Sequence, residues 1–223
     1  MATSRISCHH DRTFIIDTDT TALIVIDMQR DFFADETGAF EGAMMDVVPR
    51  VESLLETCRA AGLAIVHTRE GYASDMSDVS PFRESLGYVG RDGPFGRFLV
   101  RGEHGHDFLD SVRPLPGETV IDKPGFDGFF ATDLDQVLRN AGVRHLILAG
   151  VTTQCCVHST LRSAVDRGYW CLTVADCCAA LDPDLHDAAL QLIAGEGHLF
   201  GWIADLADVD AGLRVLGRTT YYV

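Results

Sequence analysis

The chain of 223 residues is long enough for one large domain or two small ones, and it can bury roughly 70% of its unfolded surface. Hydrophobic residues make up 47% of it and charged residues 23%, which matches ordinary globular proteins and excludes collagen-like and coiled-coil classes. Aspartates and glutamates number 33 against 18 lysines and arginines, so the formal net charge is −15. Because so acidic a chain repels nucleic acid and anionic membrane, we expect neither as a partner.

The chain contains no apolar run of the roughly 18 residues that a membrane helix needs. The first residues are polar and lack the apolar region of a signal peptide, so we expect a cytoplasmic protein. Its seven cysteines, among them the adjacent pairs Cys155–Cys156 and Cys177–Cys178, should then stay reduced. Reduced cysteines serve as core residues, metal ligands or nucleophiles.

Strands and helices are predicted to alternate after an amino-terminal tail of residues 1–20. Residues 22–26 form a continuous apolar, β-branched run, which is typical of a strand buried on both faces of a parallel sheet. Residues 46–61 have helical spacing of apolar side chains and end at Gly62. The cycle continues with strands at 63–67, 119–122, 145–149 and 170–175, and with helices at 131–140, 153–167 and 184–194.

This alternation predicts an α/β fold: a three-layer, doubly wound, Rossmann-like and mostly parallel sheet of about six strands, with helices on both faces. No shift in composition marks a boundary, so we expect residues 1–223 to form a single domain. The long irregular stretch 70–116 is predicted to be a functional or partner-binding loop.

Three reactive side chains follow predicted strands. Asp27 ends the first strand, Lys123 follows the strand 119–122, and Cys156 opens the helix after the strand 145–149. Ligands of open α/β sheets bind at the carboxyl ends of the strands, and a helix amino terminus favours a thiolate. Taken singly, each residue has an ordinary structural explanation, as a turn aspartate, a surface lysine or a core cysteine. Their coincidence at one edge favours a catalytic site.

The motifs around these residues resemble those of the isochorismatase-like cysteine hydrolases. They read IDMQRDF from Ile26, DKPG from Asp122 with FFATDL from Phe129, and GVTTQCCVHST from Gly150. The resemblance extends from about Thr21 to Asp205. It implies a catalytic triad of Asp27, Lys123 and Cys156, whereas Cys155 falls on a variable position.

The resemblance also implies a cis peptide bond at Val151–Thr152, which would direct the backbone amides of Thr152 and Cys156 at an oxyanion. Nicotinamidases of this fold carry an Asp-x-His metal motif where this chain reads HTREG from His67. We therefore expect no metal and no cofactor. Other segments look closest to biuret- and triuret-type ureide amidohydrolases, which makes a small ureide the expected substrate.

Two further residues are candidates for substrate binding. Phe32 is expected to wall the pocket. Glu196 replaces part of a Gln-Gly-Gly segment of the biuret hydrolases, and its carboxylate would accept hydrogen bonds from the N–H groups of triuret. The open alternative is that Glu196 faces solvent beside a glycine at the helix end.

The sequence thus predicts an amidohydrolase that releases ammonia from a ureide through a thioester-like intermediate on Cys156. Two alternatives stay open: an amidase for ureidoacrylate or N-carbamoyl amino acids, and a catalytically silent scaffold subunit of the same fold. The resemblance implies a homo-oligomer, a tetramer or a dimer. Residues 72–93 and 219–223 are candidate subunit contacts.

Overall fold

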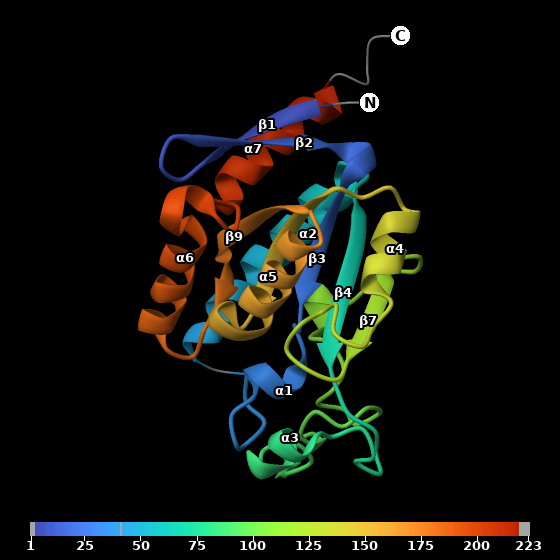
Figure 1. The fold of residues 1–223 in the computed structure, drawn as a ribbon. Helices are drawn as coiled ribbons and strands as arrows, with labels where there is room; N and C mark the ends of the chain where they lie inside the picture. The colour runs from blue at the N-terminus through green and yellow to red at the C-terminus, as the bar shows by residue number, and fades with distance from the viewer. Residues whose placement is uncertain (1–2, 41, 219–223) are drawn as a thin grey trace.

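The computed structural model describes residues 3–40 and 42–218, and its centre is one parallel sheet (Figure 1). Six strands form this sheet in the order β10-β9-β8-β3-β4-β7, and every neighbouring pair is parallel. They are β3 (Thr21–Ile26), β4 (Ala64–Glu70), β7 (Thr119–Lys123), β8 (His145–Val151), β9 (Trp170–Ala179) and β10 (Trp202–Ala204). The predicted fold class is confirmed.

Helices cover both faces of the sheet, as the continuous apolar strands require. All six residues of β3 are buried, and alternate side chains enter opposite cores. Leu23 and Val25 share one core with α2 (Val48–Ala60) and α7 (Leu206–Arg218). The opposite core holds Ile24 and Ile26 with helices α4 (Leu134–Asn140), α5 (His158–Asp166) and α6 (Pro183–His198).

The amino-terminal residues form a β-hairpin and not the expected tail. Its strands β1 (Thr3–Cys8) and β2 (Arg12–Asp17) pair antiparallel; β1 packs against α7, and both strands contact β10. The Ser4 hydroxyl donates a hydrogen bond of 2.6 Å to the Gly212 carbonyl. Alternating burial along both strands explains the docking, because one face of the hairpin is apolar.

The stretch between β4 and β7 contains only short elements, as its glycines and prolines predict. They are α3 (Pro81–Ser85), β5 (Asp92–Gly93), β6 (Gly96–Arg97) and η3 (Asp110–Val112). With α1 (Arg30–Phe33), α3 lies beyond the carboxyl ends of the strands, at the lower end of the view in Figure 1. This part of the chain therefore covers the edge where the predicted reactive residues lie.

The remaining short elements are η1 (Thr18–Thr20), η2 (Ala43–Val47) and the π-helical turn η4 (Thr153–Val157). The expected helix 153–167 thus begins with one wide turn before α5. In the part of the chain that the structure describes, no helix is both long and apolar enough to span a membrane. Residues 219–223, a predicted subunit contact, lie outside the described residues.

Candidate active site

Four reactive side chains meet at the carboxyl edge of the sheet. Asp27 directly follows β3, Glu70 and Lys123 end the paired strands β4 and β7, and Cys156 lies in the turn η4 after β8. None of the four is more than 4% exposed. Asp27 has a φ of +52°, which is uncommon for a residue other than glycine; such conformations cluster at active sites, although they also occur in turns. The structure therefore brings the three predicted catalytic residues together and adds Glu70.

Lys123 and Asp27 form a buried ion pair, with 2.7 Å between Nζ and Oδ2. The ammonium also donates to the Gly125 carbonyl at 2.7 Å, and the Thr68 hydroxyl donates to Asp27 Oδ1 at 2.6 Å. Burial alone would lower the pKa of Lys123, but the neighbouring Asp27 carboxylate raises it above its ordinary value. The lysine therefore stays a cation that can hold negative charge in the site.

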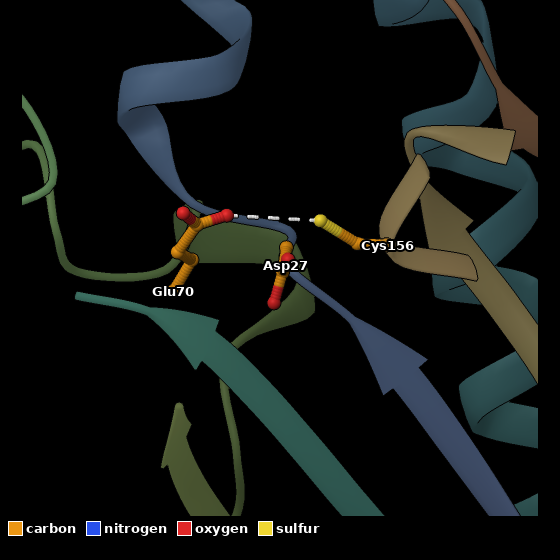
Figure 2. A group of neighbouring side chains, drawn as sticks. All are labelled: Asp27, Glu70 and Cys156. Atoms are coloured by element: carbon orange, nitrogen blue, oxygen red, sulfur yellow. Dashed lines mark hydrogen bonds between the residues drawn. The ribbon is translucent and has the colours of Figure 1, made fainter. Parts of the chain in front are cut away.

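Glu70 was not predicted, yet its carboxylate lies beside Cys156, the predicted nucleophile (Figure 2). The Cys156 thiol donates to Glu70 Oε2 at 3.7 Å, and the same oxygen lies 4.0 Å from Lys123 Nζ. Tyr72 donates its hydroxyl to the other oxygen at 3.0 Å, and Arg83 Nη2 lies 3.4 Å from it. Burial raises the pKa of Glu70 above its ordinary value. Its place at the end of a strand adjacent to β3 is the signal that could have found it.

A pair of hydrogen bonds from Gln29 fixes the backbone around Glu70. The Gln29 amide donates to the Glu70 carbonyl at 2.9 Å and accepts from the Glu70 N–H at 2.7 Å. Gln29 also donates to the His106 carbonyl at 3.1 Å, so it joins β3, β4 and the long loop. Gln29, two residues after Asp27 in the same motif, therefore holds Glu70 in place.

The surroundings of Cys156 favour the protonated thiol over the thiolate. Its hydrogen bond with Cys155 and then its burial raise the pKa of Cys156 well above the ordinary value, against the lowering effect of Lys123. A thiolate must therefore form together with the transfer of its proton to an adjacent base. Sγ and carboxylate oxygens of Asp27 and Glu70 lie within 4.8 Å of one another, so both bases are within reach.

The turn before Cys156 has a shape that its sequence requires. Gly150 has a φ of +114°, and a Cβ there would lie 2.1 Å from the Ile26 carbonyl oxygen. The expected cis peptide bond at Val151–Thr152 is present. The Thr152 carbonyl accepts hydrogen bonds from the N–H groups of Cys155 and Val157, at 3.0 and 3.2 Å. The role of the Thr152 and Cys156 amides toward an oxyanion stays a prediction.

The two predicted substrate-binding residues lie in different parts of the molecule. Phe32 belongs to α1 at the catalytic edge, is partly buried and meets the Phe98 ring edge-on at 6.0 Å. Glu196 is exposed near the end of α6, where His198 contacts His10 of the hairpin. The start of α6 lies beside the turn η4, where His186 Nδ1 is 2.8 Å from Thr153 Oγ1, whereas Glu196 lies near the other end of α6, at a kink where Gly195, Glu196 and Gly197 leave helical φ and ψ values. The expectation that Glu196 lines the pocket is therefore corrected: within this chain it faces solvent.

Asp27, Glu70 and Cys156 are also the one group of described residues whose donor atoms could together bind a metal ion. Carboxylate oxygens and a thiolate are suitable ligands for a divalent cation. A metal ion would, however, compete with the Lys123 ammonium, which already lies against both carboxylates. The Lys123 ammonium therefore fits this place better than a metal ion does.

Comparisons with known proteins identify relatives of this chain. Residues 21–208 match the model of the isochorismatase domain. A ureidoacrylate amidohydrolase RutB from Methylorubrum extorquens is 34% identical over 88% of this chain and 84% of its own length, and one from Caulobacter vibrioides is 32% identical over 86% and 91%.

Solved structures show the same fold. A cysteine hydrolase from Pseudomonas syringae superposes with a TM-score of 0.80 at 29% identity, over 90% of this chain and 95% of that one. An N-carbamoylsarcosine amidase from Thermoplasma acidophilum superposes with a TM-score of 0.67 at 26% identity, over 84% and 96%.

Proposed function

The chain belongs to the isochorismatase family, and from this premise we propose that it is a cysteine-dependent amidohydrolase that cleaves a C–N bond of a small ureide. The observation that carries the proposal is the buried cluster in which the Cys156 thiol, the Asp27–Lys123 ion pair and Glu70 lie in contact. A catalytically silent scaffold would have no need to bury two carboxylates, a lysine and a thiol together, since such burial is costly.

Asp27 acts as the base in the first half of the reaction. It takes the proton of the Cys156 thiol, and the thiolate attacks the ureide carbonyl carbon to form a C–S bond. The carbonyl electron pair moves to oxygen, and the amides of Thr152 and Cys156 donate hydrogen bonds to this oxyanion. Lys123 stabilises the negative charge that moves between sulfur and carboxylate.

The second half returns the enzyme to its resting state. The oxyanion collapses, the C–N bond breaks, and protonated Asp27 gives its proton to the leaving nitrogen. Asp27 then deprotonates a water molecule, whose oxygen attacks the thioester-like carbonyl. The C–S bond breaks, and Asp27 gives the proton to the departing Cys156 sulfur, which restores the thiol and the carboxylate. Glu70 holds the thiol through its hydrogen bond and offers an acceptor to the substrate's N–H groups.

Triuret and biuret fit the reacting end of the site, because a buried carboxylate acceptor suits a molecule rich in N–H donors. Glu70 supplies that acceptor in place of Glu196. Ureidoacrylate and N-carbamoyl amino acids are the second candidates, supported by the similarity to ureidoacrylate amidohydrolases and to an N-carbamoylsarcosine amidase.

Ammonia release from triuret, biuret, ureidoacrylate and N-carbamoylsarcosine tests the proposal directly. We expect turnover of at least one of these four ureides, unchanged after dialysis against EDTA. Inactivity on all four would contradict a ureide hydrolase, and loss of activity with the chelator, restored by added metal, would contradict catalysis without a metal.

Assembly and compartment also belong to the proposal. We expect a cytoplasmic homo-oligomer, a dimer or tetramer, in which the loop around α3 is a candidate contact. Light scattering after size-exclusion chromatography measures the molar mass; a monomer of 24.4 kDa at all concentrations would contradict the oligomer.

A further inference from the structure

A groove of about 810 Å³ opens beside the catalytic cluster, and we call it the outer groove. Its volume is within the range of small-molecule pockets. Biuret would fill only a small part of it. The lining residues come from three segments: the loop with α3, the end of β7 with the residues after it, and α5.

The outer groove borders the reacting groups through three residues. Arg83 lines it and lies 3.4 Å from Glu70; Gly125 lines it and accepts the hydrogen bond of Lys123. Ser159 lines it from α5, three residues after Cys156, and therefore lies about one helical turn from the nucleophile. A substrate bound at Cys156 can thus extend its far end into the groove.

Three phenylalanines give the outer groove an apolar character. Phe126 is half-buried, and the Arg83 guanidinium lies 3.4 Å above its ring centroid. Phe82 on α3 is 67% exposed and Phe130 after β7 is 61% exposed. Large apolar side chains that are exposed together beside a polar centre mark a surface that binds an apolar group.

The charged side chains of the outer groove already have partners within the described chain. Arg83 lies against Glu70 and donates to the Tyr88 hydroxyl, and Arg101 pairs with Asp78. The carboxylate of Asp122 receives two hydrogen bonds from Arg69, at 2.7 and 3.1 Å. Asp127 accepts from the Ser163 hydroxyl and the Phe129 N–H, both at 2.8 Å. A substrate carboxylate would have to compete with these partners, whereas an uncharged group would leave them intact.

We propose that the outer groove binds the nitrogen substituent of the ureide and selects uncharged, apolar substituents, aryl or alkyl. The inference rests on the proposed function for the reacting end of the substrate. It deepens that function by naming the substrate class as N-substituted ureas of the form H₂N–CO–NH–R. Phe82 and Phe130 are the residues that determine specificity for R.

Binding to the Cys156→Ser variant tests the groove without turnover. Calorimetry compares benzylurea with methylurea, which share the carbamoyl group and differ only in R. We expect benzylurea to bind roughly tenfold more tightly, because the ring buries its apolar surface against the phenylalanines. Adding Phe130→Ala should remove most of that preference; the side chain is exposed, so the variant should fold.

Leu192→Ala is the matched control, since Leu192 is 56% exposed on α6 outside the groove. It should leave the preference unchanged. Four results would each overturn the inference. The two ureas bind equally, or neither binds; N-carbamoylglycine binds more tightly than benzylurea; or Phe130→Ala leaves the preference for benzylurea unchanged. Failure of the proposed function shows instead as absent turnover by the wild-type enzyme, which is a separate measurement.

Discussion

The two adjacent-cysteine pairs lie in similar places and differ in what surrounds them. Cys155–Cys156 follows β8 and Cys177–Cys178 lies in the neighbouring strand β9. Cys156 and both members of the β9 pair are buried thiols with a raised pKa, and burial is the main cause for Cys177 and Cys178, raising the pKa of Cys178 to about 12. Burial therefore does not distinguish the pairs.

The charged neighbours do distinguish them. Cys156 donates to a carboxylate and lies in a cluster with a second carboxylate and a buried ammonium. Cys177 packs among apolar residues on one face of the sheet, and Cys178 packs on the other. Cys156 therefore has neighbours that can take its proton and hold its charge, as its proposed role of nucleophile requires, whereas Cys177 and Cys178 lie among apolar residues.

The largest effect is expected for exchanging the nucleophile itself. Cys156→Ser should lower kcat by about 10⁴-fold or more, because a hydroxyl is a far weaker nucleophile in the same geometry. Cys177→Ala is the control: kcat should stay within about threefold, and the free energy of unfolding should fall by about 1 kcal/mol for the small cavity. Steady-state ammonia release and urea denaturation measure both. Near-normal turnover by Cys156→Ser would contradict the contrast between the pairs.

Removing the Lys123 ammonium should make the cluster of buried carboxylates destabilise the fold. Lys123→Met leaves Asp27 and Glu70 buried without their ammonium, which should cost about 3–5 kcal/mol of unfolding free energy at pH 8. Burial already raises the pKa of the Glu70 carboxyl, and without the cation nothing at position 123 opposes this effect, so the folded protein gains a proton as the pH falls. In urea denaturation, the loss of unfolding free energy relative to the wild type should therefore be smaller at pH 5 than at pH 8. A deficit independent of pH would argue against two unpaired carboxylates.

Neutralising the second carboxylate tests whether contact with the thiol matters. Glu70→Gln keeps the shape but removes the charged acceptor beside Cys156, so kcat/KM should fall by roughly 10- to 100-fold. Circular dichroism verifies the fold. Unchanged kcat/KM on every active ureide would mean that Glu70 serves only to hold Tyr72 and Arg83.

The smallest effect on activity is expected for Glu118, a carboxylate that contacts no thiol. Glu118 bonds to Arg59 at 2.7 Å and to His67 at 2.8 Å on the β4–β7 side. Burial acts to raise the pKa of Glu118, but the hydrogen bond from Arg59 and further donors lower it to about 2. Its stabilisation is therefore present above the ordinary pKa near 4.3 and is lost as the pH falls toward 2.

Glu118→Gln should lower the free energy of unfolding by about 1–2 kcal/mol at pH 7, with kcat unchanged. The difference from the wild type should narrow at pH 3. If this difference in unfolding free energy grew as the pH fell, it would contradict the lowered pKa of Glu118.

The sequence predicted the parts of the site that strand periodicity controls. Asp27, Lys123 and Cys156 each follow an apolar run, and the parallel topology brings all three to one edge. Glu70 was missed because no apolar run ends at it in the sequence, and its contact with the site depends on the register of β4 beside β3. Glu196 was misplaced because a local motif says nothing about how far a helix carries the chain from the edge. The hairpin β1–β2 was missed because the alternation of apolar and polar residues in its strands is short, and it indicates a buried face only once α7 is known to pack there.

Trapping the covalent intermediate tests the central claim most directly. Wild-type enzyme is mixed with an active ureide, quenched in acid within the first turnover, digested and mapped by mass spectrometry. The account predicts an acyl adduct on the peptide with Cys156, assigned to Cys156 by fragmentation and absent from Cys156→Ser. Turnover with no adduct, or an adduct on Cys155, Cys177 or Cys178, would contradict it.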